Sequence, residues 1–291
     1  MTQAAGLVVV DKPAGITSHD VVSRVRRLAG TRKVGHAGTL DPMATGVLLV
    51  GVNRATRLLG HLMLTTKAYD ATVRLGVSTH TDDAEGDVLA EASASFLQPG
   101  LVLAEFEEQR GDILQVPTAV SAIKVDGKRA YQRVREGEEV ELRARPVTIH
   151  ELVVRDQRVV GEWIDVEISV RCSSGTYIRA IARDVGEALG VGGHLTALRR
   201  TAVGPFGIDD AHTLDELGED FTMIPIAEVA RRCFPSLDLD DEQAADVRVG
   251  RRLAIEVRDD APHAVFAPDG EFLALYERAG GELRPRAVFV G

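Results

Sequence analysis

The chain has 291 residues, enough for one large domain and a smaller one, and its 45% hydrophobic and 27% charged content excludes a disordered protein. Its two cysteines, Cys172 and Cys233, lack the spacing of a zinc site or a disulfide framework, so we expect neither metal nor disulfides. The sequence has no signal peptide and no apolar run long enough to span a membrane, which predicts a cytoplasmic protein without a membrane partner.

The net charge of −10 is spread unevenly along the chain. Residues 1–80 carry ten Lys or Arg and four Asp or Glu, whereas residues 205–291 carry nine and nineteen. Because the local field rather than the net charge attracts a polyanion, the basic N-terminal part is compatible with a nucleic-acid partner. The alternative is that the surface charge is merely uneven.

A strand and a helix are expected first. Residues 7–10 are an apolar run typical of a buried strand, and a turn with Pro and Gly follows. A Thr-Ser pair at 17–18 offers an N-cap, and apolar residues at helical spacing predict a helix that Gly30 ends. The basic residues beyond it, Arg32 and Lys33, belong either to a solvated flank or to a phosphate contact.

A segment dense in glycine and proline covers residues 35–46 and leads into an apolar run at 47–52. Such a density predicts a fixed, irregular backbone rather than a helix or a strand interior. Asp41 is therefore held by a rigid loop before a buried strand. An acid in this position is a nucleophile, a general base or a cap, and the segment alone does not decide between them.

The middle of the chain alternates strands and loops. Residues 67–75 have the alternation of a half-buried strand, with Tyr69 on its apolar face, where a core tyrosine is the simplest reading. Residues 78–86 form a polar loop, and 101–110 a short helix. A strand at 120–125 precedes a basic segment, 128–137, that is typical of a protruding arm.

Residues 147–154 and 163–172 are expected to form two antiparallel strands, the second with one packed face and one face nearer water. The helix that follows carries Arg179 in its first turn, where the helix dipole disfavours a cation. Arg179 is therefore either exposed to solvent or paired with a carboxylate. An acidic stretch with Pro225 and Pro235 is expected to be a linker before a small β-rich domain.

No Walker loop, Rossmann fingerprint or GxSxG elbow is present, so the chemistry has to come from the motifs as a set. Together these motifs closely resemble the bacterial TruB family of tRNA pseudouridine-55 synthases, in the style of an actinobacterial member, from about residue 6 to about residue 205. The motifs are DKPAGITS at 11–18, GHAGTLDPMATG at 35–46, KAY at 67–69, VPTAVSAIK at 116–124, SGTYIR at 174–179 and LRR at 198–200.

The resemblance implies a pseudouridine synthase fold of the α/β (α+β) class, with a mixed, largely antiparallel sheet flanked by helices. It implies a catalytic domain at 1–225 with an RNA-gripping insertion at 124–145, and a small β-rich, PUA-like domain at 236–291. The segment 236–291 matches the family's PUA domain only weakly and is acidic, so we expect it to contact little RNA.

The resemblance also implies the reaction. One uridine in the T-loop of tRNA becomes pseudouridine as its glycosidic bond moves from N1 to C5, without cofactor or metal. The expected partner is the T-arm stem-loop of tRNA, and we expect a monomer without an obligate protein partner. A relative that modifies another RNA, and a non-catalytic RNA-binding or RNA-folding protein, are the alternatives.

Three catalytic roles follow from the family's motifs. Asp41 would be the nucleophile and would attack either C6 of the base or C1′ of the sugar. Arg179 would pair with Asp41 and keep it charged. Tyr69 would stack on the target base, and its hydroxyl would help to remove the C5 proton.

Other residues would contact the RNA. His36 would fill the gap left by the flipped base, and Leu198 would form an apolar wall of the pocket. Lys12 is a further candidate, although its motif packs beneath the catalytic loop, which favours a structural role. The remaining RNA-contact candidates are basic: Arg32, Lys33, Lys124, Lys128 and Arg129. The loop at 79–82 has His80 where many relatives carry an acid, so we assign it no catalytic role.

Overall fold

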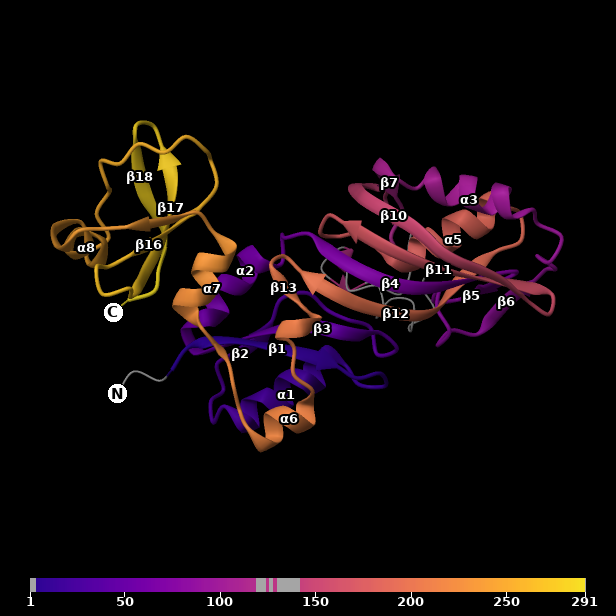
Figure 1. Cartoon of the computed structure of the whole chain (residues 1–291), viewed down its shortest axis with the longest axis horizontal. Coiled ribbons are helices and arrows are strands. Elements are labelled where there is room, and N and C mark those ends of the chain that lie inside the picture. Colours follow the sequence, from indigo (N-terminus) through magenta and orange to yellow (C-terminus); the bar gives the residue numbers. More distant parts are fainter. Residues whose placement is uncertain (1–3, 119–123, 126–127, 130–141, 291) are drawn as a thin grey trace.

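The structure is a computed structural model that describes residues 4–118, 124–125, 128–129 and 142–290. A long sheet runs through most of the chain, and a smaller sheet lies near the C-terminus (Figure 1). The main path of the long sheet follows the order β14 (Ile224–Pro225), β1 (Gly6–Lys12), β3 (Thr45–Val52), β12 (Gly193–Val203), β4 (Lys67–Leu75), β11 (Trp163–Cys172), β10 (Arg145–Val160) and β7 (Gly111–Gln115). Two short strands extend it: β2 (Val34–His36) pairs with β3, and β13 (Phe206–Gly207) pairs with β12.

Among the described strands of the long sheet, all neighbours are antiparallel except β3 and β12, which are parallel. The predicted mixed, largely antiparallel sheet is thereby confirmed. The parallel pair sets Arg200 of β12 beside Gly46 of β3, so β12 runs next to the strand that leaves the Asp41 loop. β12 also pairs with β4, where Arg200 lies opposite Tyr69.

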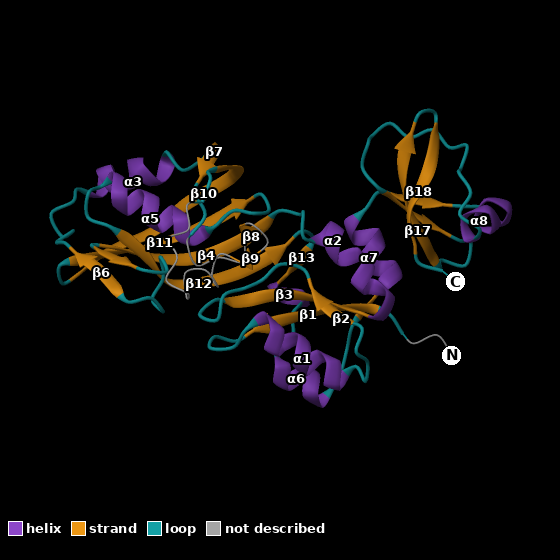
Figure 2. Cartoon of the chain, turned by 180° about the vertical axis from the view of Figure 1, so that it is seen from behind, coloured by secondary structure: helices purple, strands orange, loops and turns teal. Residues whose placement is uncertain are grey.

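Helix α1 (Ser18–Leu28) forms where its local signals predict it. Thr17 and Asp20 make a reciprocal capping box at its start, and Val21, Val22 and Val25 are buried. Helix α6 (Leu214–Glu219) lies beside α1 in both views (Figures 1 and 2). The shorter elements between β3 and β7 are η1 (Asn53–Leu58), α2 (Leu59–Leu62), β5 (Val77–Thr79), β6 (Val88–Glu91) and α3 (Pro99–Glu107).

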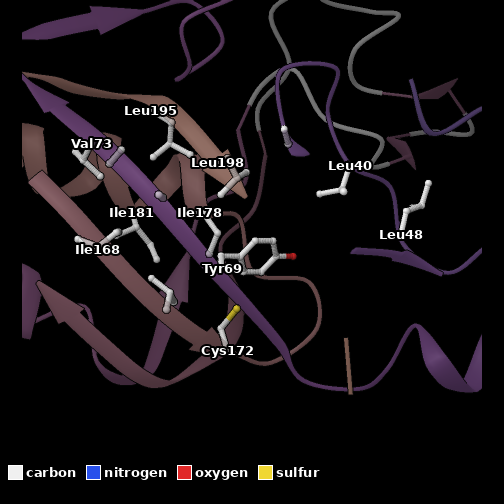
Figure 3. Packing of buried hydrophobic residues seen from close by; sticks show 14 of the residues in the cluster. Leu40, Leu48, Tyr69, Val73, Ile168, Cys172, Ile178, Ile181, Leu195 and Leu198 are labelled. Carbon is white, nitrogen blue, oxygen red and sulfur yellow. The ribbon is translucent and has the colours of Figure 1, made fainter. Parts of the chain in front are cut away.

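The core beneath the sheet is shared by β4, β11, β12 and helix α5 (Ile178–Ala188). Figure 3 shows Ile178 and Ile181 of α5 packed among apolar side chains of these strands. The ring of Tyr69 belongs to this cluster, and its hydroxyl points toward the side on which Leu40 and Leu48 lie (Figure 3). The fold therefore anchors the tyrosine through its ring.

The two predicted strands at 147–154 and 163–172 are confirmed as the antiparallel pair β10 and β11. One side chain departs from the expected pattern. Asp165, predicted on the face nearer water, is only 6% exposed, because both its carboxylate oxygens accept hydrogen bonds from Arg74 at 2.8 Å. The ion pair satisfies the carboxylate, which allows its burial.

The predicted linker around Pro225 and Pro235 is wrong. The stretch folds into α6, η2 (Ile208–Asp210), β14 and α7 (Ile226–Cys233), and β14 pairs with β1. The capping box of Thr213 with Glu216 begins α6, and Val229 of α7 is fully buried. The Thr-x-x-Glu spacing was a readable helix signal, which the acidic composition obscured.

The C-terminal region is rich in strands, as expected: β15 (Ser236–Asp238), β16 (His263–Phe266), β17 (Phe272–Ala279) and β18 (Glu282–Val288). It also contains a helix that was not expected, α8 (Asp241–Arg248). Its sheet packs on the rest of the chain through one apolar cluster. Phe266, Phe272 and Phe289 share that cluster with Leu49 of β3 and Leu58 of η1. The domain bounds 1–225 and 236–291 stay a prediction.

Most of the predicted insertion at 124–145 lies outside the described residues. Within it, β8 (Lys124–Val125) and β9 (Lys128–Arg129) pair antiparallel. Within the described ranges, no helix is both long and apolar enough to cross a membrane.

Candidate active site

A pocket of about 380 Å³ lies where the Asp41 loop faces β4, β12 and the start of α5. Asp41, Tyr69 and Arg179, predicted as the catalytic set, all line it, and so does Leu198. These residues come from four separate segments, so the fold brings together what the sequence keeps apart. A larger, more open hollow of about 510 Å³ also touches Leu198 but contains none of the catalytic three.

Arg179 lies between two carboxylates. Its guanidinium is 3.0 Å from Asp41 on one side and 3.2 Å from Asp83 on the other, and it donates a hydrogen bond of 2.7 Å to the Thr81 carbonyl. Arg179 is only 4% exposed, so solvent exposure does not explain its place at a helix start. The pair of acids offsets the unfavourable helix dipole at that position.

The two carboxylates differ in access. The side chain of Asp83 is 3% exposed, whereas that of Asp41 is 37% exposed and opens into the pocket. Asp83 therefore holds Arg179 from the protein side, and Asp41 presents an oxygen to whatever enters. The geometry is that of an accessible, charge-stabilised carboxylate.

Sequence reasoning missed Asp83. The polar loop around it, to which no role was assigned, supplies both Asp83 and the Thr81 carbonyl to Arg179. Asp82 in the same loop has a positive φ of 59° and lies 3.4 Å from Arg183. An acidic loop of this kind has the composition of a solvated turn, so only the three-dimensional contact reveals its function.

Buried side chains hold the loop backbone on both sides of Asp41. The Ser18 hydroxyl donates to the Leu40 carbonyl at 3.0 Å and accepts from the Leu40 amide at 2.9 Å. The Lys12 ammonium, fully buried, donates to the Pro42 carbonyl at 3.2 Å. Both contacts fix the backbone next to Asp41, as expected of a preorganised site.

Lys12 points inward, beneath the catalytic loop. Its ammonium also donates to the carbonyls of Pro13 and Ile16 at 2.9 and 2.8 Å, and burial lowers its pKa to about 8. These contacts and its 0% exposure favour the predicted structural role over the predicted RNA contact, and both stay predictions.

Tyr69 is 8% exposed. Burial raises the pKa of its phenol, while the charge and the hydrogen bond of Arg200 act in the opposite direction. Tyr69 can therefore be both a core residue and a residue of the site, because its ring belongs to the core cluster and the residue also lines the pocket.

Of the predicted RNA contacts whose side chains are described, Leu198 lines this pocket, and His36, Arg32 and Lys33 do not. Leu198 is 8% exposed, and His36 is half-buried on β2, with its ring edge-on to that of His19 at 5.5 Å. Arg32 and Lys33 are exposed. Lys124, Lys128 and Arg129 lie on β8 and β9, and their side chains are outside the described part.

Among the described residues, no group of three or more His, Cys, Asp or Glu could hold a metal ion. The chemistry that the pocket itself offers is a carboxylate paired with an arginine, a tyrosine hydroxyl and apolar walls.

Family models match most of the chain. Residues 26–178 match "TruB family pseudouridylate synthase (N terminal domain)". Residues 179–228 match "tRNA pseudouridylate synthase B C-terminal domain", and residues 234–290 match "tRNA Pseudouridine synthase II, C terminal".

Two curated relatives are similar over nearly their whole length. The chain is 55% identical to the tRNA pseudouridine synthase B of Arthrobacter sp. (strain FB24), with 98% of this chain and 96% of the relative covered. It is 56% identical to that of Thermobifida fusca (strain YX), with 99% of each covered.

Solved structures are similar in fold. An H/ACA RNP bound to a substrate RNA containing 2′-deoxyuridine contains a chain with a TM-score of 0.73 and 26% identity, with 98% of this chain and 85% of that chain covered. A chain of a Cbf5-Nop10-Gar1 complex has a TM-score of 0.72 at the same identity and coverage.

Proposed function

Because this chain belongs to the TruB family of pseudouridylate synthases, we propose that it isomerises uridine-55 in the T-loop of tRNA, with Asp41 as the nucleophile. The chain is a tRNA pseudouridine synthase, an isomerase, as its relatives' name and their 55–56% identity over the full length indicate. The assignment of Asp41 as the nucleophile is supported by one observation: its side chain opens into the pocket and is paired with the buried Arg179.

The reaction balances without an added reagent. The bond from N1 of the base to C1′ of the ribose breaks, the base turns, and a bond from C5 to C1′ forms. C5 then loses its proton and N1 gains one, so that the product is an isomer of uridine. The protein has to supply a nucleophile, a proton acceptor and a closed space in which the detached base stays in place.

Asp41 is suited to the first of these tasks. Its carboxylate is paired with Arg179 at 3.0 Å, which fixes its orientation, and the 37% exposure of the Asp41 side chain leaves room for the substrate. When Asp41 forms a covalent bond, either to C6 of the base or to C1′ of the sugar, it loses its charge. Arg179 then still has Asp83 at 3.2 Å, so its guanidinium is not left unpaired.

Tyr69 is suited to the second task. It lines the same pocket, where its ring can stack on the target base, a contact worth roughly 1–3 kcal/mol per base. Its hydroxyl points from the side of Ile178 and Leu198 toward the side of Leu40 and Leu48 (Figure 3), and we propose that it helps to remove the C5 proton, accepting it as the neutral phenol passes its own proton on to solvent.

The target base has to leave the T-loop stack, which costs a few kcal/mol. We assign His36, on the strand that enters the catalytic loop, to fill the gap, and Leu198 to wall the pocket. Arg32 and Lys33 are exposed near this entrance strand and are proposed as phosphate contacts. We further propose that the protein works in the cytoplasm as a monomer on the T-arm of tRNA.

The test is to incubate the protein with an unmodified tRNA transcript and to map pseudouridine along it. We expect one modified position, uridine-55. Modification at another position, or of another RNA alone, would support the rival substrate. Tight tRNA binding without any pseudouridine would support the non-catalytic alternative.

A further inference from the structure

Arg200 is one of the largest fully buried side chains of the protein, with 1% exposure, and it lines the pocket without being one of the three catalytic residues. Burying a guanidinium is unfavourable unless its donors are satisfied, so a buried arginine at a pocket wall requires a physical reason. Arg200 donates hydrogen bonds to backbone carbonyls, whereas Arg179 pairs with carboxylates.

These carbonyls belong to the catalytic loop and to the strand that leaves it. Nε of Arg200 donates to Val47 at 2.7 Å, and the two terminal nitrogens donate to Gly38 at 3.2 Å and to Thr39 at 3.4 Å. The planar guanidinium therefore spans both ends of the segment that carries Asp41. A shift of Arg200 would move the loop on either side of the carboxylate.

Two glycines fit the loop against β12. Gly46 has φ of +97°, and a Cβ there would lie 2.2 Å from the Arg200 carbonyl oxygen, closer than any side chain can approach. Gly38 has φ of +92°, which favours glycine, and a Cβ there would lie at an ordinary contact distance of 3.7 Å from the Arg200 guanidinium. The close approach to the backbone of β12 thus explains Gly46, and the positive φ explains Gly38.

Arg200 also reaches the second catalytic side chain. It lies directly opposite Tyr69 in the register of β12 and β4, so both side chains are on the same face of the sheet. Both residues line the pocket, and the charge of Arg200 opposes the rise that burial causes in the pKa of the Tyr69 phenol.

We propose that Arg200 is a positioning residue, whose side chain holds the Asp41 loop against the strand position opposite Tyr69, so that Asp41 and Tyr69 keep one geometry. The inference rests on the proposed function of Asp41 and Tyr69. Arg200 itself needs no contact with the reacting atoms, and it acts through the two groups that it holds.

The test compares Arg200→Gln and Arg200→Lys with Arg199→Gln as the matched control. Arg199 is adjacent on β12, but its side chain is 41% exposed and pairs with Asp11 at 2.8 Å. The measurements are the single-turnover rate on a tRNA transcript, the Kd for the same transcript, and the isotope effect on that rate with 5-deuterated uridine.

We expect Arg200→Gln to lower the single-turnover rate by about 100-fold, the loss typical of a misplaced catalytic group. Its Kd should stay within about threefold of wild type, because phosphate contacts dominate affinity for tRNA. The deuterium isotope effect should increase, because a misplaced Tyr69 makes removal of the C5 proton more rate-limiting. Arg200→Lys should recover part of the rate, since it keeps the charge and one donor but lacks the planar fork.

Arg199→Gln should change the rate by no more than about threefold, as expected for a partly exposed pair. A wild-type rate in Arg200→Gln, a loss of tRNA affinity that accounts for the fall in rate, or an unchanged isotope effect would overturn the proposal. Loss of the folded state in both Arg200 variants would also overturn it, in favour of a role in the fold alone. Absence of pseudouridine with the wild-type protein would instead reject the proposed function.

Discussion

The pocket and the C-terminal sheet both pair arginines with carboxylates, but they do so in different surroundings. In the pocket, the side chains of Arg179 and Asp83 are 5% and 3% exposed at 3.2 Å. In the C-terminal region, Arg248 and Glu271 are closer, at 2.6 Å, yet their side chains are 45% and 40% exposed. The shorter distance belongs to the weaker kind of pair, since exposed pairs contribute only about 0–1 kcal/mol.

The difference separates the two regions by function. Buried charges are unfavourable unless they are paired, so the pocket keeps them where the proposed chemistry needs a charged carboxylate. The C-terminal arginines are engaged with acids at the surface: Arg248 with Glu271, Arg251 with Asp246, Arg252 with Glu282, Arg278 with Asp260, and Arg284 and Arg286 with Glu277. This region has little unpaired positive charge to offer to a phosphate backbone.

The largest effect is expected at the accessible carboxylate of the pocket. Asp41→Asn keeps the shape but removes the nucleophilic charge, so pseudouridine formation should fall by more than about 10⁴-fold. Affinity for tRNA should stay nearly unchanged, as measured by filter binding beside single-turnover kinetics. Asp87→Asn, at an exposed position, is the control. Full activity of Asp41→Asn would reject the proposed mechanism.

Removal of the buried arginine should affect both activity and stability. Arg179→Ala leaves Asp83 buried without its cation, so the free energy of unfolding should fall by about 3–5 kcal/mol. The single-turnover rate should fall by at least about 100-fold, because Asp41 loses its partner. Urea unfolding and single-turnover assays at a temperature where the variant is folded check the two effects.

The matched variant is Arg248→Ala, which breaks an exposed pair and should cost less than about 1 kcal/mol without a change in rate. Equal losses of stability in the two variants would break the distinction between the regions. A near-normal rate in Arg179→Ala would reject the proposed pairing with Asp41.

A pair of basic residues from each region tests which surface contacts tRNA. Arg32→Gln with Lys33→Gln should weaken tRNA binding roughly tenfold. The slope of log Kd against log salt concentration should fall by the amount expected for the loss of about two phosphate contacts. Arg251→Gln with Arg252→Gln removes as much charge but should change Kd by less than about twofold, because both arginines pair with acids at 2.7 and 3.5 Å. Filter binding over a range of salt concentrations gives both slopes, and the opposite ranking would assign the RNA surface to the C-terminal sheet.

Local signals explain what could be predicted from the sequence. The bounds of β4 are those of its apolar alternation, and α1 begins at the predicted cap, because both depend on residues close in sequence. The Asp41 loop was identifiable from its glycines and proline for the same reason. The roles of Asp41, Tyr69 and Arg179 came instead from the family resemblance and stay proposals.

Contacts over long sequence distances explain the rest. Asp83 and Arg179 are 96 positions apart, and nothing near Asp83 distinguishes it from a solvated acid. The sequence shows Arg200 only as part of the LRR motif. In the structure, the register of β12 sets it opposite Tyr69, and its side chain donates to the Val47 carbonyl, next to the Asp41 loop. The segment with Pro225 was read as a linker because its composition is acidic, although pairing with β1 makes it part of the sheet.

The ion pair of Asp82 and Arg183 is less buried than the pair of Arg179 and Asp83 and more buried than the pair of Arg248 and Glu271. We expect its substitution to have the smallest effect on the protein. The two side chains are 15% and 19% exposed at 3.4 Å. Burial raises the pKa of Asp82 from 3.8 to about 6, and Arg183 opposes this rise only in part. The folded protein thus binds this proton more tightly than the unfolded chain does, so Asp82 makes the free energy of unfolding fall as the pH rises from 3.8 to about 6.

Asp82→Asn removes this titration and suits the positive φ of 59°, which asparagine tolerates well. Arg183 keeps Asp184 at 2.7 Å and the Val116 carbonyl at 2.8 Å, so it is not left unpaired. We expect the variant to be more stable than wild type by about 1 kcal/mol at pH 7.5, after allowance for solvent screening, and to lose this advantage at and below about pH 4. Urea unfolding at both pH values measures the difference, and a loss of stability at pH 7.5 would show that the attraction to Arg183 outweighs the burial of the charge.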